Sequence, residues 1–143
     1  MLRDILIKEW MSKNVVSATP DTPITEAHSI MKKNNIRRLP ILEKGKIVGI
    51  ITIGDVREAG PSDATTLSIW ELNYLWSQIR VKSIMSTKVF TVTAEEPMIN
   101  AARIMLEHKV SGLPVLDAKG KIVGIVTESD IFRMLVKSQT ETI

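Results

Sequence analysis

The sequence has no cysteine and few aromatic residues. Its 143 residues include three Trp, two Phe and one Tyr. The absence of cysteine excludes a disulfide framework, a thiolate nucleophile and a zinc site built on Cys. No apolar run approaches the roughly 20 residues of a membrane-spanning helix, and residues 1–10, MLRDILIKEW, mix charged and apolar side chains. We therefore expect a soluble, cytoplasmic protein with no signal peptide and no membrane association.

A strong charge of one sign is also missing. The 19 Lys and Arg residues are opposed by 16 Asp and Glu residues, so the formal net charge is only +3. Bulk charge therefore gives little support for nucleic acid as a partner, although the sequence pI is about 9.3. We do not expect nucleic-acid binding, which would have to show a steep dependence on salt.

The residue patterns that enzymes use for catalysis are absent. The sequence has no Gly-rich phosphate loop ending in Lys and Ser or Thr. His28 and His108 lie in different halves of the chain, without a nucleophile or carboxylate partner at a recognisable spacing. Surface or helix-end positions are the ordinary assignment for such histidines. We expect no catalytic residue, no metal site and no catalytic cofactor.

The chain does contain an internal repeat. GKIVGIITIGD at 45–55 recurs as GKIVGIVTESD at 120–130, and aligning Met11 with Met85 extends the match over most of the chain. Two copies of this length indicate a tandem pair of small domains rather than a solenoid. Units of about 50 residues are marginal alone, so we expect the copies to pack together. The predicted divisions are a first repeat at residues 1–59, a helical linker at 60–80 and a second repeat at 81–143.

Each copy has the same predicted order of elements. Short β-branched or aromatic runs at 14–18 and 88–92 predict a first strand. Pro23 and Pro97 mark helix starts, because apolar residues at helical spacing follow each of them. Two apolar runs joined by a Gly-bearing turn then predict a hairpin, and a final helix follows it. The expected fold class is α/β (α+β), with two pseudo-symmetric β-α-β-β-α repeats.

The linker is expected to form a helix from about Thr66 to Ile79. The Gly-Pro-Ser-Asp stretch at 60–63 interrupts regular structure before it. Apolar residues, Trp70 and Tyr74 among them, cover more than the single stripe that a surface helix needs. Two interpretations stay open. The helix fills the seam between the copies, or one of its faces contacts a second subunit or a client protein, as wide apolar patches do.

Each copy ends its last strand in Thr-x-x-Asp. Thr52 with Asp55, and Thr127 with Asp130, come where a strand passes into a helix, so free backbone N–H groups attract anions there. A Thr hydroxyl can donate to phosphate, and an Asp carboxylate can accept from both hydroxyls of a ribose. The alternative is a helix-capping box with no ligand.

This constellation resembles the cystathionine-β-synthase (CBS) domain family, whose tandem pairs are called Bateman modules. The matching features are Met11 and Met85, the LPIL and LPVL strands, the G-K-I-V-G-I segments and the terminal Thr-x-x-Asp. The likeness covers nearly the whole chain apart from the linker, which is similar to that of stand-alone prokaryotic pairs. The resemblance implies repeats packed through their sheets, clefts that hold adenosine ligands, and a disc-like homodimer.

The resemblance also implies one ligand site in each repeat. In the first, Thr52 and Gly54 would contact phosphate and Asp55 the ribose hydroxyls. The base pocket there would be formed by Val16, Ser17, Ile36 and Pro40. The counterparts in the second repeat are Thr127, Ser129, Asp130, Phe90, Thr91, Val110 and Pro114.

The two predicted sites differ just before the Leu-Pro of each hairpin. The first repeat has Arg37 and Arg38 there, and the second has Ser111 and Gly112. Because a guanidinium fork suits phosphate oxygens, we expect phosphate recognition to depend on the Arg pair. The alternative is a solvated turn, where cations interact favourably with the end of the preceding helix.

The function implied by the resemblance is regulatory. Binding of AMP, ADP, ATP or S-adenosylmethionine between the repeats would shift the population of two domain arrangements, and a client protein would respond. The sequence does not identify the client. The alternative function is a structural or interaction module without ligand, which acts through the Trp-rich linker helix.

Overall fold

The computed structural model describes residues 4–60 and 68–141. Packing divides the chain into two compact units. One is Val16–Val89; the other, which we call the split unit, combines Met1–Val15 with Phe90–Ile143. The repeats predicted from the sequence follow the duplication. In the structure, the segment at the start of each repeat belongs instead to the unit that holds the rest of the other repeat.

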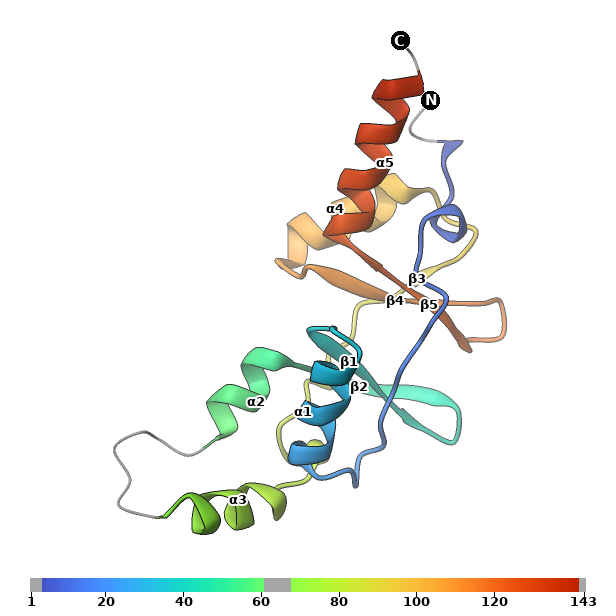
Figure 1. Ribbon diagram of the computed structural model, residues 1–143. Helices are drawn as coiled ribbons and strands as arrows, with labels where there is room; N and C mark the ends of the chain where they lie inside the picture. Colours follow the sequence, from blue (N-terminus) through green and yellow to red (C-terminus); the bar gives the residue numbers. More distant parts are fainter. Residues whose placement is uncertain (1–3, 61–67, 142–143) are drawn as a thin grey trace. The chain divides into compact units, whose positions relative to one another are not determined.

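The Val16–Val89 unit is built on an antiparallel hairpin. Its strands pair from Arg38 opposite Thr52 to Glu43 opposite Lys46, with an irregularity between Ile41 and Leu42. The elements are α1 (Ile24–Lys33), β1 (Arg38–Glu43), β2 (Lys46–Thr52), α2 (Ile53–Ala59), α3 (Ile69–Ser77) and a 3-10 turn, Val81–Ser83. Helix α1 packs against β1 and helix α2 against β2, whereas α3 packs against α1 (Figure 1).

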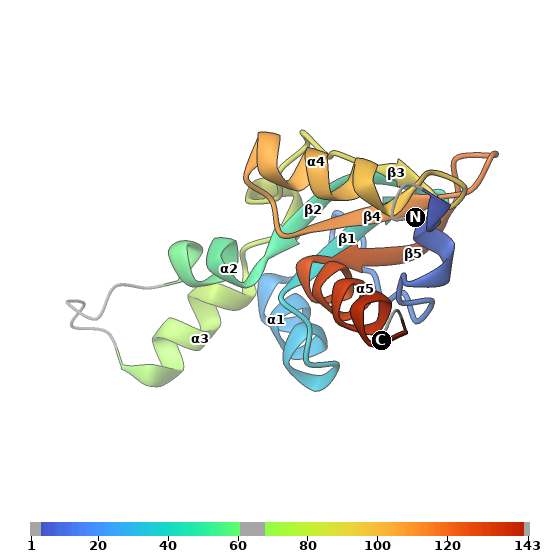
Figure 2. The ribbon, with the colours of Figure 1, turned by 90° about the horizontal axis from the view of Figure 1, so that it is seen from above.

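The split unit contains a three-stranded sheet in the order β3-β4-β5. β3 runs parallel to β4, and β4 runs antiparallel to β5. Helices α4 and α5 lie over one face of this sheet (Figures 1 and 2). The elements are a 3-10 turn (Ile7–Glu9), β3 (Val92–Thr93), α4 (Met98–His108), β4 (Gly112–Leu116), β5 (Ile122–Thr127) and α5 (Glu128–Glu141). The mixed helix and sheet content confirms the α+β class.

The helices predicted to start at proline do so. Pro23 and Pro97 are the N-cap residues of α1 and α4, and both have extended backbone angles. Each helix buries one apolar face, as its spacing predicts. The buried residues are Ile24, Ala27 and Met31 in α1, and Met98, Ala101 and Met105 in α4.

The first strands predicted for each repeat are largely wrong. Within 14–18, only Ala18 pairs, in an isolated parallel bridge with Ile41. The 88–92 strand is reduced to β3, which starts at Val92 and ends at Thr93. A β-branched run becomes a strand only where it has a partner along its length, and here the partner strand offers one or two positions.

The segment in front of each repeat packs on the hairpin of the other repeat. Ser12 exchanges backbone hydrogen bonds with Ile125, at 2.8 and 3.0 Å, and Ser86 does the same with Ile50, at 2.9 Å in both directions. Ile7 is fully buried in the core of the split unit. Neither packing unit therefore consists of one uninterrupted repeat.

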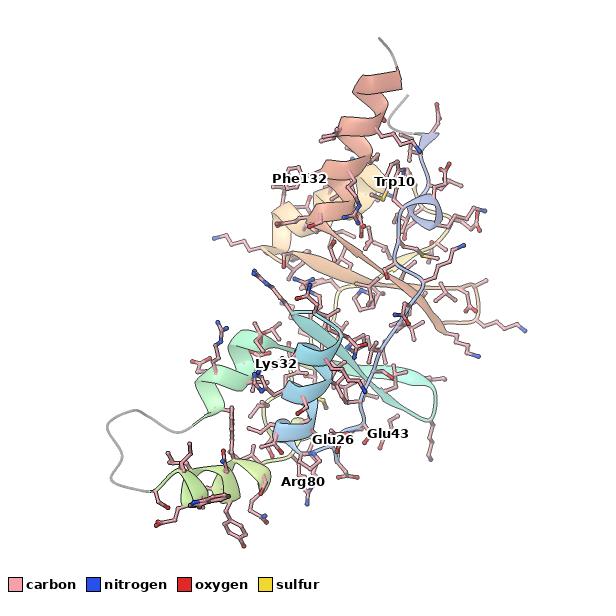
Figure 3. The ribbon with its side chains drawn as sticks, in the orientation of Figure 1. Trp10, Glu26, Lys32, Glu43, Arg80 and Phe132 are labelled. Atoms are coloured by element: carbon pink, nitrogen blue, oxygen red, sulfur yellow. The ribbon has the colours of Figure 1, made fainter. Side chains whose placement is uncertain are left out.

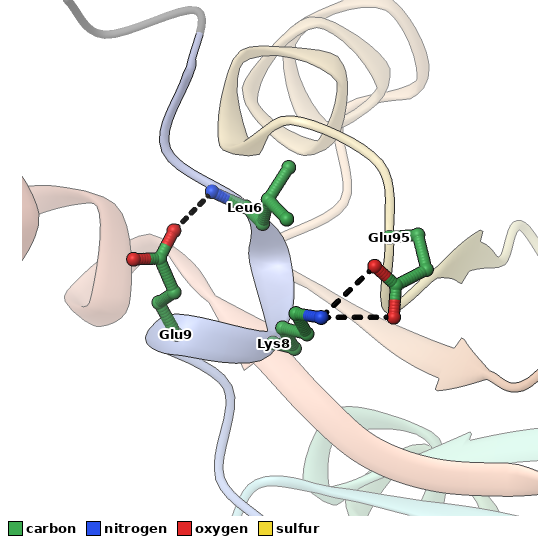
Figure 4. A network of polar contacts seen from close by, with 4 residues as sticks. All are labelled: Leu6, Lys8, Glu9 and Glu95. Carbon is green, nitrogen blue, oxygen red and sulfur yellow. Dashed lines mark hydrogen bonds and ion pairs between the residues drawn. The ribbon is translucent and has the colours of Figure 1, made fainter.

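Polar contacts also hold the N-terminal segment in the split unit. Lys8 Nζ donates to both carboxylate oxygens of Glu95, at 3.0 and 3.1 Å, and the Leu6 N–H donates to Glu9 Oε2 at 2.6 Å (Figure 4). Trp10 lies beside α5 (Figure 3), where Lys137 Nζ lies 5.8 Å from the centroid of its ring. Lys8 and Trp10 thus attach the segment to the rest of the split unit, and the Leu6–Glu9 hydrogen bond shapes the segment itself.

Helix α3 has one packed face and one exposed face. Trp76 packs against the core of the Val16–Val89 unit, with its ring centroid 5.8 Å from that of His28 on α1. Trp70 and Tyr74 are 81% and 65% exposed. The predicted start of the helix at Thr66 lies outside the described residues, as does most of the Gly-Pro-Ser-Asp stretch at 60–63.

Candidate functional site

Strand register brings the predicted residues of the first repeat to one end of the hairpin. Arg38 lies opposite Thr52, and the Ile53 N–H donates to the Arg37 carbonyl at 2.9 Å. The parallel bridge of Ala18 with Ile41 places the preceding residues beside the same end of β1. The site residues gathered there are Val16, Ser17, Ile36, Arg37, Arg38, Pro40, Thr52, Gly54 and Asp55.

The second repeat has the same arrangement within the split unit. Gly112 lies opposite Thr127, and the Glu128 N–H donates to the Ser111 carbonyl at 3.1 Å. Pairing of Val92 with β4 places the residues before it beside the start of that strand. The site residues gathered there are Phe90, Thr91, Val110, Ser111, Gly112, Pro114, Thr127, Ser129 and Asp130.

These residues differ in how much of their surface solvent can reach. Gly54, Ser129, Arg37 and Ser111 are exposed, whereas Pro40, Pro114 and Gly112 are buried within strands. The Thr residues and Asp55 are half-buried. The polar groups that a ligand could reach from solvent therefore lie in two places. One is the junction between a strand and the following helix, and the other is the stretch just before β1 or β4.

In the first repeat, Thr-x-x-Asp forms the capping box of α2. The Asp55 N–H donates to Thr52 Oγ1 at 3.1 Å, and the Thr52 N–H donates to Asp55 Oδ2 at 2.8 Å. The capping interpretation is thus confirmed here. It leaves capacity for a ligand, because a carboxylate has about four lone-pair sites and the Thr52 hydroxyl hydrogen has no acceptor among the described residues.

In the second repeat, the same motif has more internal partners. The Thr127 N–H and hydroxyl both donate to Asp130 Oδ2, at 2.8 and 3.3 Å. Arg133 forms an ion pair with Asp130 Oδ1 from the next turn of α5. The Asp130 side chain is only 3% exposed. Both oxygens of this carboxylate are therefore engaged within the protein.

Two residues near the second site were missed in the sequence-based prediction. Arg133 lies three residues after Asp130, a spacing that brings helical side chains together, so the pair was visible in the sequence. His108 ends α4 and stacks on Phe90, with ring centroids 3.8 Å apart. No sequence signal joins these two rings, because they are distant along the chain and meet through the fold.

The described part of the chain shows no sign of a metal centre. His, Asp and Glu side chains there form no group of three or more that could hold a metal ion. None of the helices within 4–60 and 68–141 combines the length and apolar character needed to cross a membrane.

Solved structures with the same fold contain adenosine ligands. The CBS domain pair of protein MJ0100, crystallised with 5′-methylthioadenosine and S-adenosyl-L-methionine, is 34% identical, with a TM-score of 0.76 over 93% of this chain and 97% of that one. CBSX2 from Arabidopsis thaliana, crystallised with AMP, is 25% identical, with a TM-score of 0.76 over 94% of this chain and 98% of that one.

Sequence relatives divide into proteins of similar length and much longer ones. A CBS domain-containing protein of Dictyostelium discoideum is 35% identical over 93% of this chain and 92% of its own length. L-Aspartate semialdehyde sulfurtransferase of Methanocaldococcus jannaschii is 36% identical over 90% of this chain, which spans only 23% of that enzyme. A model of the CBS domain matches residues 3–62 and 81–137. The chain therefore belongs to the CBS domain family, as a tandem pair of CBS domains.

Proposed function

We propose that this chain is a regulatory module that binds an adenosine-containing ligand, of the class AMP, ADP, ATP or S-adenosylmethionine, and transmits the resulting change to a client protein. The observation that carries the proposal is the gathering of Thr52, Asp55 and the Arg37–Arg38 pair at one end of the β1–β2 hairpin.

The chemistry of these groups matches the parts of a nucleotide. The Asp55 carboxylate has lone pairs that accept from the two hydroxyls of a ribose. The Thr52 hydroxyl and the Arg37 guanidinium donate to phosphate oxygens, and Arg37 is exposed at this junction. Adenosine ligands in structures that share the fold support the same class of ligand for this chain.

The test is isothermal titration of the full chain with AMP, ADP, ATP and S-adenosylmethionine, repeated on Asp55→Ala. We expect binding of at least one ligand, and a loss of roughly 10- to 150-fold in affinity for Asp55→Ala, because hydrogen bonds to a charged group contribute about 1.5–3 kcal/mol. Absence of binding by any of the four, in protein free of co-purified nucleotide, contradicts the proposal.

A matched control separates the site from general charge effects. Asp21 is a carboxylate in the same unit, 82% exposed and paired with Lys82 at 3.1 Å. Asp21→Ala should leave ligand affinity unchanged. Because Asp55→Ala also removes the carboxylate half of the α2 capping box, thermal unfolding of each variant must first establish that it is folded at the temperature of the titration.

A second candidate function rests on α3. Its exposed apolar side chains, Ile69, Trp70, Tyr74 and Leu75, form a patch of the kind that marks protein contacts. Under this alternative the chain is an interaction module, and Trp70→Ala with Tyr74→Ala abolishes association with a partner or with a second copy while leaving nucleotide titrations unchanged. Sedimentation of the wild-type chain also tests the homodimer that the family resemblance implies.

A further inference from the structure

The ribose-binding carboxylates proposed for the two repeats are not equally available. Asp130 is engaged at both oxygens, by Thr127 and by Arg133, and 3% of its side chain is exposed. Asp55 is half-buried and accepts from the Thr52 N–H through one oxygen. The two aspartates occupy equivalent positions in the duplication, so the difference comes from their neighbours.

The neighbour that differs is one turn along the helix. Arg133 follows Asp130 by three residues, and the residue three after Asp55 is Glu58. An acid at this spacing repels the aspartate, whereas an arginine binds it. Among the described residues, no basic side chain pairs with Asp55.

We infer that Arg133 is a specificity-determining residue that competes with the ligand for Asp130, so that the first repeat binds an adenosine diol in preference to the second. This inference rests on the proposed function, since it concerns the same class of ligand. The Arg133 guanidinium occupies one lone-pair site of Asp130 Oδ1, so a ligand diol must share this oxygen with the guanidinium or displace it.

The arrangement also provides a route for that displacement. The Arg133 side chain is 63% exposed, so it exchanges the carboxylate for water without unpacking the core. The pair joins an exposed guanidinium to a buried carboxylate, so its competition should exceed that of a surface pair and lower ligand affinity by at least about fivefold.

The experiment is isothermal titration of the full chain with AMP and, separately, S-adenosylmethionine. In the wild-type chain we expect the tighter site to be lost in Asp55→Ala and retained in Asp130→Ala. Arg133→Met, which keeps an aliphatic stem, should strengthen the weaker site at least about fivefold. That gain should disappear when Asp130→Ala is added. Arg103→Met, on exposed α4 surface, is the matched control and should change neither site.

A reciprocal variant protects the test against misfolding of Arg133→Met. Glu58→Arg introduces the same i, i+3 pair beside Asp55 and should weaken the first site about fivefold. Unchanged or weaker binding at the second site in a folded Arg133→Met, with Asp55-dependent binding intact, overturns the inference alone. Absence of binding in the wild-type chain and every variant overturns the proposed function and the inference with it.

Discussion

Gly49 and Gly124 lie where the packing leaves no room for a side chain. A Cβ at Gly49 would lie 2.5 Å from Met85 Sδ and 3.1 Å from the Ser86 carbonyl oxygen, and Gly124 faces Met11 in the same way. The thioether can shift, but the carbonyl belongs to a paired backbone. The repeated Gly and the repeated Met are therefore two halves of one contact, although each lies far from its partner in the sequence.

Replacing Gly49 with Ala should lower the free energy of unfolding by about 1–3 kcal/mol, the usual cost of overpacking. The measurement is urea unfolding followed by circular dichroism. Gly54→Ala is the control, because its Cβ would meet only Thr52 Oγ1, at 3.6 Å, and Ala is favoured over Gly within a helix. Equal stability of the two variants would contradict this account of the contact.

At the candidate site, the sequence indicates which residue types recur but not how each is hydrogen-bonded. The repeated Thr-x-x-Asp is equal in both copies, yet Asp55 closes a capping box and Asp130 is also held by Arg133. The ligand assignments of the remaining site residues stay predictions. The hydrogen bonds of each Asp depend on neighbouring residues that differ between the copies. An alignment of the two repeats matches the residues that are alike and does not draw attention to these differences.

At the scale of elements, the helices and the hairpin strands were predicted, whereas the first strand of each repeat was largely wrong. α1 and α4 follow from proline at the start and apolar residues at helical spacing, which are local signals. The strand expected at 14–18 depends on a partner that only the fold supplies, and Ala18 alone finds one. The hairpin turns were also predictable, because each contains a glycine. Gly45 and Gly120 have φ of +80° and +81°, a region where glycine is favoured.

The two faces of α3 should respond differently to mutation. Trp76→Ala removes a ring packed on the core of the Val16–Val89 unit, so we expect a loss of about 2 kcal/mol in the free energy of unfolding. Trp70→Ala, at a position that is 81% exposed, should change it by less than about 0.5 kcal/mol. Urea unfolding measures both, and the reverse order would mean that α3 packs through its other face.

At the scale of the whole molecule, the duplication and the packing do not coincide. The segment holding Ile7 precedes the first repeat but completes the core of the second, and Val81 does the reverse. Sequence similarity alone could not predict this exchange, because it aligns each segment with its own repeat. Cutting the chain in the linker would therefore leave each half without a segment that its core requires.

This exchange predicts where a core mutation acts. Ile7→Ala should cost about 2–4 kcal/mol, and its effect should appear in the strands of the split unit. Hydrogen exchange should show a larger loss of protection in β4 and β5 than in β1 and β2. Leu106→Ala, in the same unit but 82% exposed, serves as the control and should change neither. A loss concentrated in β1 and β2 would contradict the exchange.

The central claim is that an adenosine ligand binds where Thr52, Asp55 and the Arg37–Arg38 pair meet. The most direct measurement is an NMR titration of the ¹⁵N-labelled chain with AMP and with S-adenosylmethionine, following each backbone amide. The account predicts that shifts concentrate at 16–17, 36–38 and 52–55, and that Asp55→Ala removes them. Absence of shifts with both ligands, or shifts confined to α3, would contradict it.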